Sequence, residues 1–95
     1  MNIPPKLIDG AKVLEWAWSG NMPFGVIKYS DSNEVAAEIY GLAICQYKDS
    51  KIIYRFSCNK NWETEQDSDY SSIEEAKNNL PEQYKIVPAT WVKYE

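Results

Sequence analysis

Residues 35–58, VAAEIYGLAICQYKDSKIIYRFSC, decide the fold because they predict a β-hairpin. A long apolar run over 35–47 and a β-rich run over 52–58 are joined by the polar turn Lys48-Asp49-Ser50-Lys51. A turn centred on Asp49-Ser50 gives one face the pairs Tyr47–Ile52, Cys45–Tyr54, Ala43–Phe56, Gly41–Cys58 and Ala37–Trp62. Small residues then stand opposite large ones, so this is the expected core face.

The opposite face of the hairpin has a mixed composition. It carries three polar residues beside three apolar ones: Gln46, Arg55 and Ser57 with Leu42, Ile44 and Ile53. We therefore expect this face to be only half solvated.

The same register bears on the two cysteines. Cys58 faces Gly41, which lies four residues from Cys45, or about 13 Å along a strand. A disulfide requires Cα atoms within about 7 Å of each other, so we expect two free thiols in the core. The first ten residues hold no apolar stretch of secretory type, and no run approaches the roughly 18 apolar residues of a membrane helix. We expect a cytoplasmic protein.

Further strands flank the hairpin. Residues 12–19 alternate, with Leu14, Trp16 and Trp18 on one face and Val13, Glu15 and Ala17 on the other. The segment 20–23 ends that strand, and 24–29 predict a second, short one. The final segment, 84–95, reads as a last strand that Pro88 places at a sheet edge.

One short helix is expected before that last strand. Ser71 with Glu74, or Ser72 with Glu75, has the spacing of a capping box. Ile73, Ala76 and Leu80 share one face over two to three turns, and Pro81 ends the helix. Residues 1–95 thus predict a single domain of α+β class: an antiparallel sheet of four to five strands with one short helix packed on one face.

Composition excludes much of enzyme chemistry. The chain has no histidine, so Ser-His and Cys-His nucleophilic sites and the usual zinc sites cannot be built. Its four glycines form no phosphate-binding loop. An EF-hand loop starting at Asp67 would need glycine and glutamate where the chain has Ser72 and Asn78. We expect no catalytic residue, no metal and no cofactor, although a small carboxylate-based enzyme remains a second alternative.

The acidic residues are concentrated in one segment. Residues 61–76 hold six of them and no basic residue, whereas the rest of the chain has eight acidic and ten basic residues. Such a segment repels phosphate backbones and attracts cationic proteins, which argues against nucleic acid as the partner. Glu63, Glu65, Asp67 and Asp69 lie between Trp62 and Tyr70, so these six residues are the predicted partner-binding site.

Two alternatives concern the aromatic residues. Trp62 and Tyr70 could instead pack the helix onto the sheet while the acids stay in water. Trp16 and Trp18, with Tyr29 and Tyr40, could form a stacking platform for single-stranded nucleic acid or sugar, but Glu15 opposes phosphate there and core packing is favoured.

Residues 54–84, YRFSCNKNWETEQDSDYSSIEEAKNNLPEQY, carry a resemblance. The stretch is similar to a pattern in small single-domain bacterial proteins of mostly uncharacterised function, some grouped with the immunity proteins of toxin systems. The resemblance covers about a third of the chain and contains no catalytic motif. It implies a cytoplasmic protein that binds and neutralises a basic toxin through acidic and aromatic surface residues.

The sequence therefore favours a non-enzymatic binding protein with a basic protein partner, without nucleic acid or membrane as partners. The first alternative is a structural domain that associates with itself.

Overall fold

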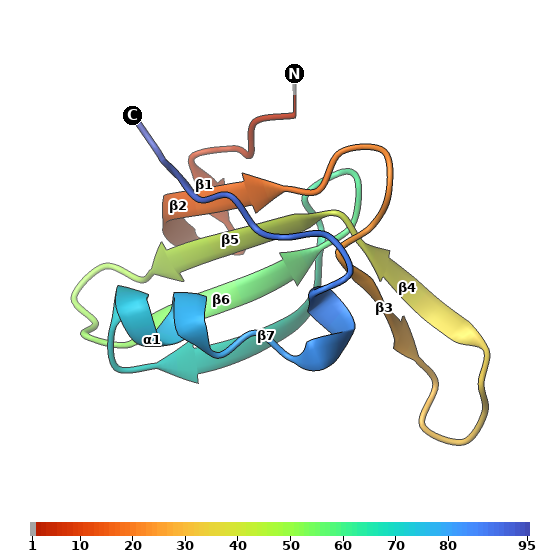
Figure 1. The fold of residues 1–95 in the computed structure, drawn as a ribbon. Coiled ribbons are helices and arrows are strands. Elements are labelled where there is room, and N and C mark those ends of the chain that lie inside the picture. The colour runs from red at the N-terminus through yellow and green to blue at the C-terminus, as the bar shows by residue number, and fades with distance from the viewer. Residues whose placement is uncertain (1) are drawn as a thin grey trace.

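The computed structural model describes residues 2–95 and consists mainly of antiparallel sheet (Figure 1). The six-stranded main sheet has the order β1-β2-β5-β6-β7, with β8 also paired to β2. Its strands are β1 (Leu7–Ile8), β2 (Ala11–Trp18), β5 (Gly41–Gln46), β6 (Ile53–Cys58), β7 (Thr64–Tyr70) and β8 (Val92–Lys93). A separate two-stranded sheet, β3 (Gly25–Lys28) with β4 (Val35–Ile39), projects from one end of the main sheet.

The hairpin register is confirmed. Strands β5 and β6 pair Gly41 with Cys58, Ala43 with Phe56 and Cys45 with Tyr54. The further pair Ala37–Trp62 is wrong, because the chain leaves the main sheet at Tyr40 and β4 pairs with β3 instead. Position 37 therefore lies in the projecting hairpin, opposite Ile27.

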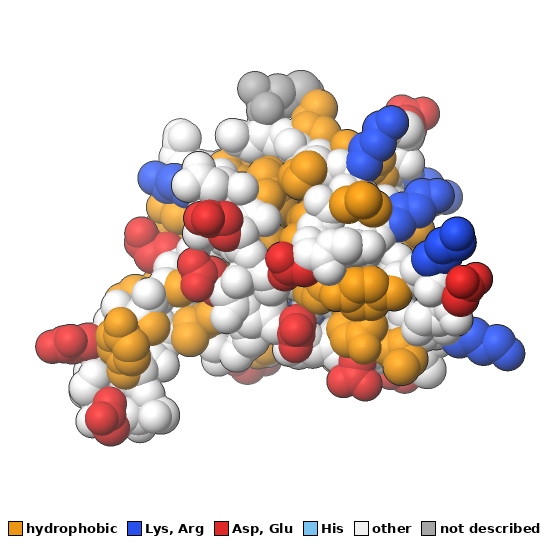
Figure 2. Space-filling model, turned by 180° about the vertical axis from the view of Figure 1, so that it is seen from behind, with side chains coloured by type: hydrophobic (Ala, Val, Ile, Leu, Met, Phe, Trp, Pro, Cys, Tyr) orange, Lys and Arg blue, Asp and Glu red, His pale blue; other side chains and the backbone are white. Residues whose placement is uncertain are grey.

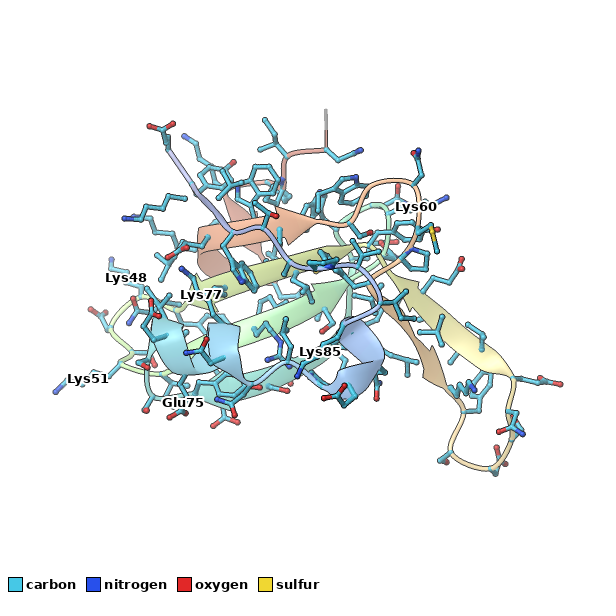
Figure 3. All side chains as sticks on the ribbon, in the orientation of Figure 1. Lys48, Lys51, Lys60, Glu75, Lys77 and Lys85 are labelled. Carbon is cyan, nitrogen blue, oxygen red and sulfur yellow. The ribbon has the colours of Figure 1, made fainter. Side chains whose placement is uncertain are left out.

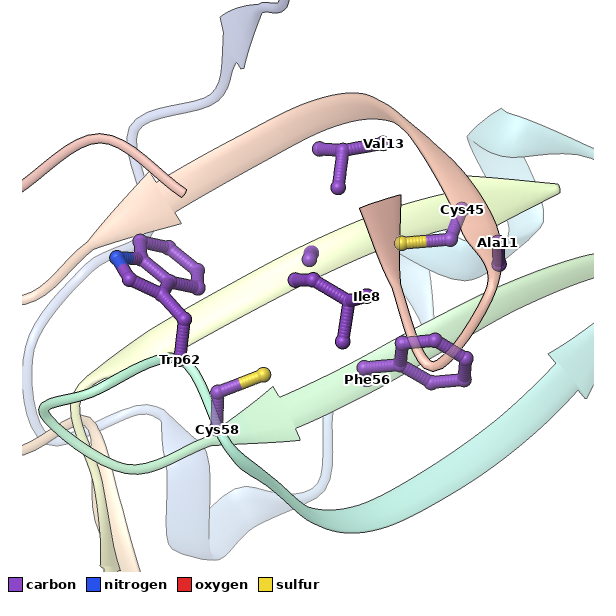
Figure 4. Close-up of a cluster of buried hydrophobic side chains, with 8 residues drawn as sticks. Ile8, Ala11, Val13, Cys45, Phe56, Cys58 and Trp62 are labelled. Carbon is purple, nitrogen blue, oxygen red and sulfur yellow. The ribbon is translucent and has the colours of Figure 1, made fainter. Parts of the chain in front are cut away.

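The expected core face of the hairpin is confirmed. The β1–β2 turn closes over it, and one cluster unites the small and large side chains: Ile8, Ala11, Val13, Ala43, Cys45, Phe56, Cys58 and Trp62 (Figure 4). Both cysteines are buried free thiols in this cluster.

The prediction of a half-solvated second face is wrong. Leu42, Ile44, Arg55 and Ser57 are all buried there. The cover is helix α1 (Ile73–Asn78), the 3-10 helix η1 (Glu82–Tyr84) and the C-terminal segment, which crosses this face in Figure 1. Most of the predicted last strand is this covering segment, and only β8 pairs with the sheet.

Alternation in β2 changes phase at a β-bulge between Val13 and Glu15. Val13 therefore shares a face with Trp16 and Trp18, whereas Leu14 and Ala17 pack on the helix-covered face. The predicted grouping of Leu14 with the two tryptophans is wrong for this reason.

Helix α1 begins as predicted, at the cap Ser72, whose hydroxyl accepts a hydrogen bond from the Glu75 amide. It has only six residues and ends before Leu80. Because so short a helix is not stable alone, its contacts with the sheet hold it. Ala76 packs on Ile44 and Ile53, and Lys77 forms a 2.6 Å ion pair with the nearly buried Glu15 of β2 (Figure 3).

A buried arginine holds the other end of α1. Arg55 of β6 is only 2% exposed and donates hydrogen bonds to the carbonyl oxygens of Ala76 and Asn79 and to the Tyr70 hydroxyl. A guanidinium suits the carbonyls at the end of a helix, where the partial charge is negative. The α+β class with one short helix on one face is thus confirmed, with a larger sheet than expected.

Candidate functional site

The predicted acidic segment forms most of an edge strand. Strand β7 pairs only with β6, so its outer backbone groups are not used in the sheet. Asp67 lies opposite Phe56 and Asp69 opposite Tyr54, which places both carboxylates on the face away from α1. Within residues 2–95 the outer side of β7 is therefore unpaired in the sheet, and these carboxylates lie on one of its faces.

Glu63 and Glu65 lie at the start of this strand. A bulge between Ser57 and Cys58 leaves Glu65 without a cross-strand partner. The Asn59 side-chain amide donates to both carboxylates, at 2.8 Å to Glu63 and 3.1 Å to Glu65. We call Glu63, Glu65, Asp67 and Asp69 the acidic edge; all four are exposed, and within residues 2–95 none is in an ion pair.

The predicted aromatic flank Trp62 lies in the core. Its side chain is 8% exposed, and its ring is centred 6.2 Å from Trp16 and 5.6 Å from Trp18. A Cβ at Gly41 would lie 2.5 Å from this ring, so glycine is needed there to admit it. Trp62 itself adopts a left-handed backbone angle, φ 61°, in the turn before β7, and this turn directs the ring inward.

The other predicted flank, Tyr70, faces the helix. It is half-buried on the α1 side of the sheet, where its hydroxyl accepts the Arg55 hydrogen bond and its ring lies 5.2 Å from the guanidinium carbon. Neither predicted ring therefore borders the carboxylates as an exposed side chain.

Tyr54, which packs against the core cluster as expected, also lies beside a carboxylate of the acidic edge. It is half-buried directly opposite Asp69. The exposed ring of Tyr47 lies 5.5 Å from that of Tyr54, edge to face, on the side towards the β1–β2 turn, where its hydroxyl donates to the Asp9 carbonyl oxygen. Viewed from behind, acidic side chains lie around an apolar patch on this face (Figure 2). The period-two alternation of acids at 65, 67 and 69 was the signal that β7 is a strand and that its neighbours on β6 share the surface.

The proposed stacking platform is not assembled. Trp18 lies 5.9 Å from Tyr40, but Trp18 packs against Trp62 and Tyr40 is itself buried, and Tyr29 lies just beyond β3 in the projecting hairpin. Lys60 places its ammonium 4.8 Å from the Tyr40 ring centre. Core packing, the alternative favoured from sequence, is what Trp16 and Trp18 do.

The two thiols have little chemical reactivity in the folded chain. Burial raises the pKa of Cys45 and of Cys58 from 9.0 to about 12, and the negative charge of the nearby Asp9 carboxylate also raises both pKa values. Both side chains therefore stay protonated at neutral pH. Because only the deprotonated thiolate is nucleophilic, the protonated thiols are unreactive. Within residues 2–95 no three His, Cys, Asp or Glu side chains are arranged to hold a metal ion.

These thiols make stability depend on pH. Since their pKa is higher in the folded than in the unfolded chain, their stabilising contribution is complete below about pH 9 and is lost as pH rises towards about 12. We expect the free energy of unfolding to fall by on the order of 1 kcal/mol per thiol for each pH unit in this window. Urea unfolding of the wild type and of C45A/C58A at increasing pH measures the effect; Tyr84, whose pKa burial also raises, titrates in both chains. Equal losses in the two chains would contradict the assignment.

No family model, curated protein or solved structure matches this chain. The resemblance of residues 54–84 to immunity proteins therefore remains a prediction. None of the helices within residues 2–95 has the length and apolar character to cross a bilayer.

Proposed function

We propose that this chain is a non-enzymatic binding protein whose acidic edge binds a basic protein. The observation that carries the proposal is the set of four exposed carboxylates along one unpaired sheet edge, none of them in an ion pair with any of residues 2–95. The nearly buried carboxylate of Glu15, by contrast, is neutralised by Lys77. The acidic edge leaves its charge available to another molecule.

The surface beside these carboxylates suits lysine and arginine. Tyr54 presents an aromatic ring next to Asp69, so a cation can contact a carboxylate and a ring at once. The charge accelerates encounter with a basic protein, and the ring supplies apolar area that is buried on contact. The binding surface proposed here is thus the acidic edge with Tyr54, in place of Trp62 and Tyr70.

The partner class we favour is a basic toxin, with this chain as its immunity protein. Support comes from the resemblance of residues 54–84 to immunity proteins and from the negative charge of the acidic edge. A protein that acts on a polyanion needs a cationic surface, and an acidic edge bound to that surface blocks access of the polyanion. Neutralisation then requires binding alone, without chemistry by this chain.

A titration with a cationic peptide tests this proposal. The probe is a short synthetic peptide with lysine at alternate positions, added to isotope-labelled protein and followed by amide chemical shifts. We expect the largest shifts at 63–69 and at Tyr54, and their loss in about 0.5 M salt, where charges are screened beyond a few ångströms. The control peptide carries glutamate in place of lysine. Shifts centred away from the acidic edge, or equal shifts with both peptides, would contradict the proposal.

A further inference from the structure

A second surface lies at the opposite edge of the main sheet, where β1 and β8 flank β2. Three hollows of about 410, 540 and 380 Å³ adjoin there: the first two share Leu7 and Lys12, and the second and third share Tyr94 and Glu95. We call this the Leu7 surface and define it by six residues: Ile3, Lys6, Leu7, Lys12, Val92 and Lys93.

The Leu7 surface combines exposed apolar side chains with lysines. Ile3 is 52% exposed, Leu7 57% and Val92 42%, so all three are exposed large apolar side chains. Lys6, Lys12 and Lys93 are exposed, and no ion pair within residues 2–95 involves them. Asp49 and Glu95 are the acids that line the same hollows.

The two edges of one sheet thus carry opposite charge. Charged side chains normally keep sheet edges apart, because copies that meet present the same sign to each other. Here the acidic edges of two copies repel, and so do the two Leu7 surfaces, whereas the acidic edge of one copy attracts the Leu7 surface of another. The charge pattern opposes symmetric pairing and favours head-to-tail contact.

We propose that the Leu7 surface binds the acidic edge of a second copy of this chain. In this contact the three lysines lie against Glu65, Asp67 and Asp69, and the exposed apolar side chains between them become buried. Because the two surfaces lie at opposite sheet edges, each contact leaves one of each kind free, so association continues beyond a dimer. The second copy occupies the acidic edge, and a basic partner must displace it.

Sedimentation of the chain alone, over a range of concentrations in low salt, tests this proposal. The wild type is expected to increase in mass past that of a dimer and to return to monomer in about 0.5 M salt. Two charge-reversed variants, E65K/D67K/D69K and K6E/K12E/K93E, each carry the same sign on both edges. Since each variant replaces attraction by repulsion at three exposed positions, each should associate on the order of 10- to 100-fold more weakly than the wild type.

Mixing the two variants gives the sharpest outcome. The reversed acidic edge of E65K/D67K/D69K is complementary in charge to the reversed Leu7 surface of K6E/K12E/K93E. The mixture should therefore form assemblies that neither variant forms alone. A control, D31K/E34K/E38K, reverses three exposed acids in the β3–β4 region and should associate like the wild type. A wild type that stays monomeric in low salt, or a mixture no heavier than its components, would overturn the proposal. K6E/K12E/K93E should still bind the cationic peptide, which separates failure here from failure of the proposed function.

Discussion

Reversing the charge of the acidic edge is expected to abolish binding of a basic partner and to leave the fold intact. In E65K/D67K/D69K each exposed carboxylate becomes an ammonium that repels the cation it attracted. With up to about 1 kcal/mol for each lost pair and a similar penalty for each repulsion, affinity for the cationic peptide should fall on the order of a hundredfold. Calorimetric titration measures the affinity, and circular dichroism follows the fold.

The matched control for this variant is D31K/E34K/E38K. It changes the net charge by the same amount but at the projecting β3–β4 hairpin, which forms a sheet separate from that of β7. A general effect of net charge would weaken both variants equally. Equal weakening, or unchanged affinity in E65K/D67K/D69K, would show that the acidic edge is not the binding surface.

Trp62→Ala is expected to cost about 3 to 5 kcal/mol of stability, because it removes a large ring from the core and leaves a cavity over Gly41. The ring also loses its contacts with Trp16 and Trp18. Urea unfolding measures the loss. Tyr29→Ala is the control: that side chain is exposed, and its removal should change stability by about 0.5 kcal/mol or less.

Trp62 also distinguishes a core residue from a partner contact. Trp62→Phe keeps an aromatic ring in the cluster, so the variant should fold and bind the cationic peptide with wild-type affinity. A Trp62→Ala chain as stable as the wild type would show that the ring is not a core element. A folded Trp62→Phe chain with weakened binding of the peptide would show that Trp62 is part of the binding surface.

The hairpin could be predicted because its information is local. Turn residues at 48–51 fix the register, and alternation of small and large residues then selects the core face down to Gly41 and Cys58. The error begins at Tyr40, where the partner of the next strand changes. Alternation shows that 35–39 is extended but cannot show that β4 pairs with β3, which depends on contacts far along the chain.

The burial of the second sheet face could not be predicted from the hairpin sequence alone. Arg55 and Ser57 are polar, so partial exposure is the natural expectation. Their burial results from η1 and the C-terminal segment, which return over the sheet from residues 80–95, and from helix carbonyls that accept the Arg55 hydrogen bonds. Long-range packing of this kind leaves no periodic signal in the sequence.

The exposure of the four carboxylates could be predicted from the sequence, whereas the positions of the aromatic side chains around them could not. Exposed carboxylates follow from composition, but a segment as acidic as 63–69 has low β-propensity, and its strand structure comes from pairing with β6. That pairing places Tyr54 beside Asp69 and turns Tyr70 towards the helix. The backbone of Trp62, in a left-handed turn, sends its ring inward, which sequence alternation cannot anticipate.

Acids on an edge strand can also serve only to prevent aggregation. Lysines at the same positions would prevent aggregation equally well, so under that interpretation E65K/D67K/D69K stays soluble and binds every partner unchanged. Binding of a basic partner requires the negative charge of these carboxylates. The sign of the charge, rather than its presence, is what the experiments test.

The most direct test of the acidic edge as a binding surface is affinity capture from lysate and culture medium of the source organism. Wild type and E65K/D67K/D69K serve as parallel baits, washed in low and then high salt, and mass spectrometry identifies what elutes. We predict a basic protein that the wild type retains in low salt and releases in high salt, and that the reversed variant does not retain. A partner retained equally by both baits, or held through the high-salt wash, would contradict the account.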